Sequence, residues 1–277
     1  MAQDLPQPIL VSELFPQILS ELLQLLRSLS ADEWQKPTAC TSWTVKDVAL
    51  HLLGVELGNL SRRRDDHRLS VSISNWQELV SVINASNQLW VEASQRISTR
   101  LLVDLLRFSG EQLSSYFASL DPYAMGSPVS WVGPKPTKIW VDLAREYTER
   151  WHHQQHIRDA VGKPGLKEQR YFSPVLQAFM LALPHTYQHV LSADGTTLAV
   201  TIMGQAGGNW SITCLGGEWR LYCGRPDYQD ASISLDEDLA WRLFTRGVDP
   251  ETARPQIRFE GDQALGEKIL DMVTIIA

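Results

Sequence analysis

The sequence lacks the motifs that mark the commonest enzyme classes. It contains no GxSxG nucleophile motif, no phosphate-binding Walker motif and no GxGxxG dinucleotide fingerprint. These absences remove the usual hydrolase, nucleotide-binding and oxidoreductase interpretations. Whatever chemistry the chain performs must therefore come from another arrangement of side chains.

Cysteine, basic charge and long apolar runs are also scarce. The three cysteines show no CxxC spacing, which favours free thiols in a reducing cytoplasm over a disulfide framework. The start of the chain has no basic region followed by an apolar one, and no apolar run is long enough to cross a bilayer. We therefore expect a cytoplasmic protein with no signal peptide and no membrane partner.

The charge balance argues against nucleic acid as a partner. The chain carries 25 Lys and Arg against 32 Asp and Glu, a net charge of -7, whereas a nucleic-acid binder normally presents a basic face. Its 277 residues suffice for one large domain or two ordinary ones. With nucleic acid and membranes disfavoured as partners, we expect a small-molecule substrate.

The first part of the chain has the periodicity of helices. Leucines and isoleucines recur at helical spacing from Leu14 onward, and Thr44 with Asp47, like Ser74 with Gln77, resembles a capping box. Turn residues crowd 121–136, which predicts a loop. We expect helices over about 14–29, 45–64, 75–95, 99–120 and 137–161, forming a four-helix bundle with extra pieces.

The pattern then changes to short alternating segments. After one more helix over about 172–190, strands are predicted near 198–203, 210–214, 219–223, 232–235 and 256–260. Gly207-Gly208 and Gly216-Gly217 are typical of hairpin turns. Asp236 should cap a helix reaching Phe244, and a last helix should end near Met272. The fold class is therefore α+β, with domains over 1–165 and 166–277.

Three of the seven histidines lie in one segment of the last bundle helix. His152 and His156 are one helical turn apart, so they can share a metal ion. His51, on an earlier predicted helix, could be a third ligand from a facing helix. Three protein ligands with open positions are typical of a catalytic metal. Each histidine could instead be an ordinary core or surface residue.

A second pair of candidate ligands lies on the same helix, rotated by about one residue from His152 and His156. Glu149 and His153 are also one turn apart, and the sequence leaves open which pair faces His51. We favour His152 and His156 as ligands. His153 then becomes a candidate proton relay, as does Asp159, which could also orient a ligand or form a salt bridge. Cys40, a few residues before the His51 helix, could be a ligand, a nucleophile or simply a small buried loop residue.

These residues resemble the mycothiol-dependent maleylpyruvate isomerase family, within the DinB-like metal-binding bundles. The segment from Trp34 through Pro37-Thr38, Trp43-Thr-Val, Asp47 and His51 matches the family's first signature. Its second signature, an acid or histidine, then a histidine, then an aspartate, falls here on His152, His156 and Asp159. The segments 236–245 and 259–262 resemble the family's sterol-carrier-like C-terminal domain.

The resemblance implies a divalent metal, zinc or alternatively nickel, and a low-molecular-weight thiol such as mycothiol. Family members add the thiol to a cis double bond, allow rotation and eliminate the thiol. Their helix ligands are a glutamate and a histidine. His152 at the first position would move this chain toward the three-histidine members of the superfamily.

Two further classes of function are compatible with these residues. The chain could be a non-catalytic protein that binds a metal or a ligand, in which the second domain mediates assembly into a homodimer. The same ligands could also activate water in a metal-dependent hydrolase. An open metal site favours an enzyme, whereas a closed site, or none, favours the binding protein.

Overall fold

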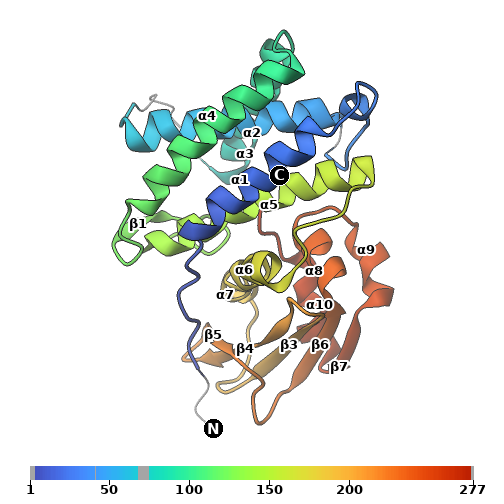
Figure 1. The fold of residues 1–277 in the computed structure, drawn as a ribbon. Coiled ribbons are helices and arrows are strands. Elements are labelled where there is room, and N and C mark those ends of the chain that lie inside the picture. Colours follow the sequence, from blue (N-terminus) through green and yellow to red (C-terminus); the bar gives the residue numbers. More distant parts are fainter. Residues whose placement is uncertain (1–3, 41, 68–74, 276–277) are drawn as a thin grey trace. The chain divides into compact units, whose positions relative to one another are not determined.

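The computed structural model describes residues 4–40, 42–67 and 75–275 (Figure 1). Contacts within the chain divide it into two compact units. The helical unit comprises Val11–Asp121 and Glu146–Leu166, and the sheet unit comprises Pro122–Arg145, the residues from Lys167 onward and those up to Leu10. The architecture is α+β, as the sequence predicts. The domain boundary between 165 and 166 stays a prediction.

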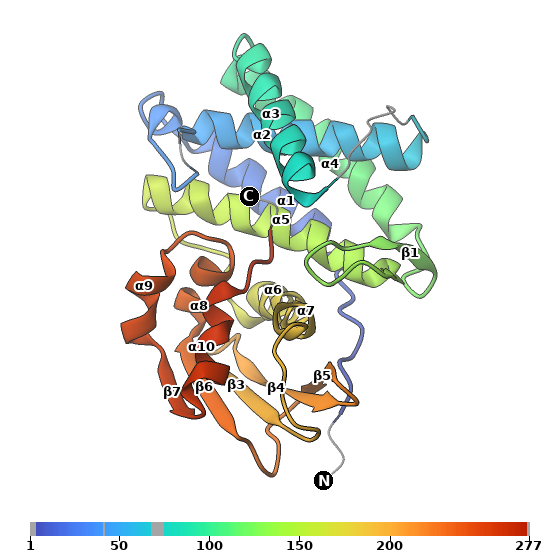
Figure 2. The same cartoon turned by 180° about the vertical axis from the view of Figure 1, so that it is seen from behind.

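The helical unit is a bundle. Its helices are α1 (Phe15–Arg27), α2 (Val45–Asn59), α3 (Trp76–Ser94), α4 (Thr99–Ala118) and the second part of α5 (Ile139–Val161). One cluster of buried leucine, isoleucine and valine side chains joins α1, α2, α4 and α5, which lie beside one another in both views (Figures 1 and 2). All five predicted helices are confirmed to within a few residues, α2 being extended by a π-helical turn, Leu60–Arg64.

The start of α2 is fixed by the predicted capping box. The Thr44 hydroxyl accepts a hydrogen bond from the Asp47 backbone N–H, and the Thr44 backbone N–H donates to the Asp47 carboxylate. A bridge between Pro37 and Thr44 closes the preceding loop. The other predicted start, Ser74, lies outside the described residues, and Asn75 caps α3 by accepting from the Glu78 N–H.

Helices α2 and α3 approach closely at a glycine. A Cβ on Gly54 would lie 2.6 Å from the indole nitrogen of Trp90, so only glycine leaves room for that ring. The same nitrogen donates a hydrogen bond to the Leu50 carbonyl at 2.7 Å. Trp90 thereby anchors α3 on the segment of α2 that carries His51.

The sheet unit contains a five-stranded sheet in the order β5-β4-β3-β6-β7. Its strands are β3 (Thr197–Met203), β4 (Gly208–Leu215), β5 (Glu218–Cys223), β6 (Ala231–Asp236) and β7 (Arg258–Gly261). β3 and β6 are parallel and the other neighbours antiparallel. Gly216 and Gly217 take positive φ in the two-residue β4–β5 turn, as a hairpin of this length requires.

Several helices lie along one side of this sheet (Figure 2). They are α6 (Gln169–Met180), α7 (Leu183–Tyr187), α8 (Glu237–Phe244) and α10 (Gln263–Glu267), and α9 (Pro250–Ala253) follows α8. Asp236 caps α8 as predicted, its carboxylate accepting from the Asp238 N–H. Within the described part of the chain, none of the helices combines the length and the apolar character that crossing a bilayer requires.

Two predictions about local structure were wrong. The single helix expected over 172–190 is divided between α6 and α7, because Pro184 has no N–H to continue the helical hydrogen bonds. The loop expected over 121–136 contains β1 (Met125–Pro128), which pairs with β2 (Pro136–Lys138). Strands this short, bordered by proline, show no alternation from which they could have been predicted.

The capping box should contribute measurably to stability. Replacing Thr44 by alanine removes the acceptor for the Asp47 N–H, so we expect the free energy of unfolding to fall by about 1 kcal/mol. Urea unfolding of the wild type and of Thr44→Ala measures this loss. Thr44→Ser keeps the hydroxyl and should retain most of the stability. An equal loss in both variants would contradict a capping role.

Candidate metal centre

Four buried histidines gather where α2 faces α5. His51 comes from α2, and His152, His153 and His156 come from α5. Each is at most 8% exposed. Together with Glu149, the three α5 histidines occupy positions i, i+3, i+4 and i+7, which form one stripe along a helix. The stripe therefore presents four side chains that can bind a metal.

Glu149 joins His51 to His153. Its Oε1 atom lies 3.2 Å from His51 Nε2 and 3.1 Å from His153 Nε2. The candidate ligand atoms of these three residues all lie within 4.8 Å of one another. The structure thus brings His51 together with the Glu149 and His153 pair, the register that the sequence left as the alternative.

A second group of ligand atoms lies on the other side of the His153 ring. Cys40 Sγ is 2.7 Å from His156 Nδ1 and 3.8 Å from His153 Nδ1. These three atoms also lie within 4.8 Å of one another. His153 therefore belongs to both groups, through a different ring nitrogen in each.

The remaining predicted site residues lie outside these groups. The His152 ring packs against those of His153 and His156, with centroids 4.8 and 4.1 Å away. Asp159 is exposed near the end of α5. Among the described residues, neither belongs to a group of converging ligand atoms. Their predicted roles, as metal ligand and proton relay, stay predictions.

The electrostatics of Glu149 and His153 are coupled. Burial alone would raise the pKa of Glu149, but the His153 charge and hydrogen bonds from His153 and His51 hold it well below its usual range. Burial alone would lower the pKa of His153, but the Glu149 charge and hydrogen bonds with Cys40 and Glu149 raise it to about 10. In the metal-free protein the two form a carboxylate–imidazolium pair, so a cation binding here must displace a proton.

His51 and His152 both have lowered pKa values, so their rings are neutral at neutral pH. Burial lowers the pKa of His51, although Glu149 partly opposes the shift. Burial and the charges of His156 and His153 place the pKa of His152 well below its usual range. His51 is therefore a neutral ring, and a cation that binds its Nε2 takes the place of the proton that this atom donates to Glu149.

The group His51, Glu149 and His153 fits a divalent ion. Two imidazole nitrogens and one carboxylate oxygen are a donor set used by catalytic zinc sites. Ligands about 2.1 Å from a tetrahedral zinc lie roughly 3.4 Å apart, close to the 3.2 and 3.1 Å observed. The Glu149 side chain is 24% exposed, so the group can be reached from solvent.

A separate buried polar cluster lies further along α2 and α5. Glu146 accepts hydrogen bonds from Asn59 at 3.0 Å and from Arg150 at 2.7 Å. Glu56 accepts a 2.5 Å hydrogen bond from Ser109. Burial raises the pKa of Glu56 to about 7, although Arg150 and Ser109 oppose the shift.

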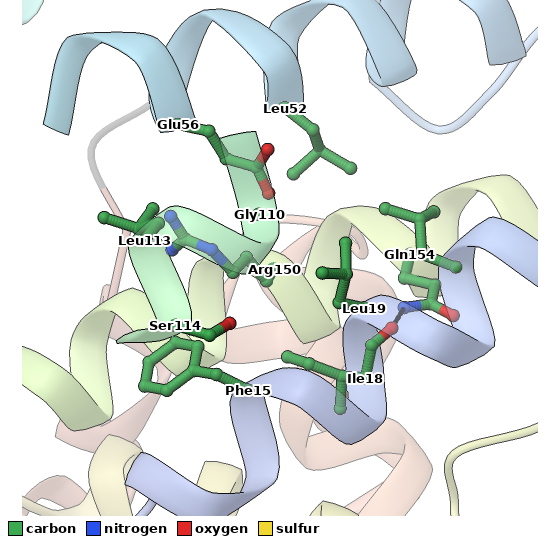
Figure 3. Close-up of a pocket in the computed structure, with 11 residues that line it drawn as sticks. Phe15, Ile18, Leu19, Leu52, Glu56, Gly110, Leu113, Ser114, Arg150 and Gln154 are labelled. Carbon is green, nitrogen blue, oxygen red and sulfur yellow. Dashed lines mark hydrogen bonds between the residues drawn. The ribbon is translucent and has the colours of Figure 1, made fainter. Parts of the chain in front are cut away.

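Glu56 and Arg150 line a small cavity inside the bundle (Figure 3). Its volume of about 20 Å³ is enough for one water molecule. Apolar side chains from α1, α2 and α4 form most of its wall. A cavity of this size is not a substrate site, and its largely apolar wall places Glu56 in a poorly solvated environment.

The chain therefore contains a helical bundle in which histidines of α2 and α5 converge with the spacing of metal ligands. The family model described as the mycothiol maleylpyruvate isomerase N-terminal domain matches residues 15–158. The chain belongs to that family. The matched residues include every member of both ligand groups.

A solved structure shows the same fold. A crystal structure of the mycothiol-dependent maleylpyruvate isomerase, in a histidine-to-alanine variant, is 10% identical and has a TM-score of 0.50, covering 84% of this chain and 86% of that one. The unsubstituted isomerase has the same identity and coverage with a TM-score of 0.49. No curated protein matches the sequence.

A sterol carrier protein domain of Helicoverpa armigera resembles part of the chain. It is 14% identical, with a TM-score of 0.29, and the match covers 39% of this chain and 91% of that one. The sterol-carrier-like character of the second domain stays a prediction.

The buried Glu56 carboxyl should make stability depend on pH. Its folded-state pKa of about 7 lies above the usual 4.5, so the folded protein holds this proton more tightly than the unfolded chain does. The resulting stability is fully present below about pH 4.5 and is lost as the pH rises to about 7. Glu56→Gln should remove this loss, on the order of 3 kcal/mol.

Urea unfolding of wild type and Glu56→Gln at about pH 5 and about pH 8 measures the effect. The variant should gain stability relative to the wild type at the higher pH. Glu13→Gln, an exposed change on the same unit, serves as the control. A stability difference between Glu56→Gln and wild type that is the same at both pH values would contradict the shifted pKa.

Proposed function

We propose that this protein is a metal-dependent enzyme that uses a low-molecular-weight thiol, as an isomerase or a thiol S-transferase. Family membership supports the thiol, because the relatives named above are mycothiol-dependent. The convergence of His51, Glu149 and His153 supports the metal. This convergence is the observation on which the proposal depends.

The three side chains have complementary tasks in this proposal. His51 and His153 would bind the ion through their Nε2 atoms, and Glu149 would bind it through the oxygen that now contacts both rings. A bound divalent ion would lower the pKa of a thiol or water and polarise a substrate carbonyl. Glu149 supplies a negative charge that favours cation binding before any thiol arrives.

The ligand types indicate which metal to expect, and the family indicates which thiol and substrate to test. Two imidazoles and a carboxylate suit zinc, and nickel is the second candidate. Mycothiol is the first thiol to test, and maleylpyruvate the first small-molecule substrate, because these are named for the relatives. A cytoplasmic location would give the enzyme access to such a thiol.

The alternatives are outcomes of the same tests. A non-catalytic metal-binding or ligand-binding protein, whether monomer or homodimer, would bind the ion without turnover. A hydrolase would turn over without a thiol. A proton-relay role for Asp159 also stays a prediction, whereas His153 would be a ligand instead of a relay.

The metal content should depend on Glu149 and not on His152. We expect about one equivalent of divalent metal in the purified protein. When the variants also carry Cys40→Ser, which removes the second group of ligand atoms, His51→Ala and Glu149→Gln should each show a large loss, because each removes one of three ligands. Elemental analysis by plasma mass spectrometry measures this content. His152→Leu, a buried change of similar size on the same stripe, should retain the metal.

The opposite pattern would support the other register. Metal lost in His152→Leu and kept in Glu149→Gln would make His51, His152 and His156 the ligands. No metal in the wild type, even after reconstitution, would overturn the metal-dependent proposal and favour a binding protein.

The thiol requirement can be tested directly. With zinc present, we expect isomerisation of maleylpyruvate only when mycothiol is added, and a loss of at least about 100-fold in Glu149→Gln, since removal of a metal ligand removes the ion that activates the thiol. Loss of the substrate's ultraviolet absorbance measures the rate. Turnover without a thiol would instead support a hydrolase.

A further inference from the structure

Cys40, His153 and His156 form a second convergence of metal-ligand atoms, which shares His153 with the one assigned above. The sulfur lies 2.7 Å from one Nδ1 atom and 3.8 Å from the other. Ligands of a tetrahedral zinc bound by sulfur and nitrogen lie roughly 3.5 Å apart. The observed distances fall on both sides of that value.

The local structure of the loop places the thiol at this position. The Cys40 backbone N–H donates to the Thr38 hydroxyl at 3.2 Å, and its carbonyl accepts from the Trp43 N–H at 2.9 Å. The loop is closed at its base by the Pro37–Thr44 bridge. Cys40 is partly exposed whereas both histidines are buried, so an ion can reach the group from the sulfur side.

We propose that Cys40, His153 and His156 form a second metal site, which takes a thiophilic divalent cation. One thiolate and two imidazoles are softer donors than the two imidazoles and one carboxylate of the first site. The two sites therefore differ in the kind of cation they prefer. The second site does not depend on the proposed enzymatic function, because it requires only the three side chains named here.

The two sites compete for His153. Its Nε2 faces Glu149 and its Nδ1 faces Cys40, so a neutral ring can offer a lone pair through only one of these atoms at a time. An ion held by Cys40 fixes the proton on Nε2, and an ion held by Glu149 fixes it on Nδ1. A thiophilic cation should therefore weaken binding at the first site.

The other two cysteines provide matched controls. Cys214 is buried in the sheet unit and Cys223 is partly exposed there. Among the described residues, neither belongs to a group of converging ligand atoms. Cys223→Ser therefore removes a thiol of similar exposure without changing the proposed site.

Cobalt substitution tests the proposal without relying on activity. Metal-free protein is titrated with Co²⁺ in buffer that contains a phosphine reductant, which keeps the thiols reduced. The near-ultraviolet charge-transfer band from sulfur to cobalt is recorded. We expect this band in the wild type, in Cys223→Ser and in Glu149→Gln, and its loss in Cys40→Ser. His156→Asn, which leaves the loop intact, should also reduce the band, and circular dichroism checks that each variant is folded.

The outcomes separate this site from the first. A wild-type protein that binds Co²⁺ without the band, or a band that survives in Cys40→Ser, overturns the second site and leaves the Glu149-dependent metal content untouched. A band lost in both Cys40→Ser and His156→Asn but kept in Glu149→Gln supports it, even if the first site proves empty of metal.

Discussion

The contact of one carboxylate with two imidazoles organises the helical unit. Glu149 of α5 reaches His51 of α2 and, one turn along its own helix, His153. A buried imidazole is costly without a hydrogen-bond partner or an ion, and this carboxylate satisfies two of them. The contact joins the facing sides of α2 and α5 at the stripe that also carries His152 and His156.

The sequence identifies the residues of the centre but not which of them meet. The period of a helix shows that Glu149, His152, His153 and His156 share one stripe. Which two face His51 depends on the rotation of α5 relative to α2, and that rotation is set by packing among helices distant in sequence. The prediction favoured His152 and His156, whereas the structure groups His51 with Glu149 and His153.

Local signals were sufficient where a few neighbouring residues decide the structure. The Thr44 capping box and the Asp236 cap were read correctly because each depends on side chains within three residues. The split between α6 and α7 at Pro184 was missed because its apolar neighbours continue the helical period. The contact of Cys40 with His156 was missed as well, since it joins residues 116 positions apart.

Thr44 connects two features that otherwise look separate. Its side chain begins α2, which carries His51, and its backbone bridges to Pro37 at the base of the loop that carries Cys40. Loop and helix start should therefore open together as one cooperative unit. Fraying at this point would withdraw ligands from both groups in a single step, so the lifetime of a bound ion would be governed by a local unfolding event instead of by bond strength alone.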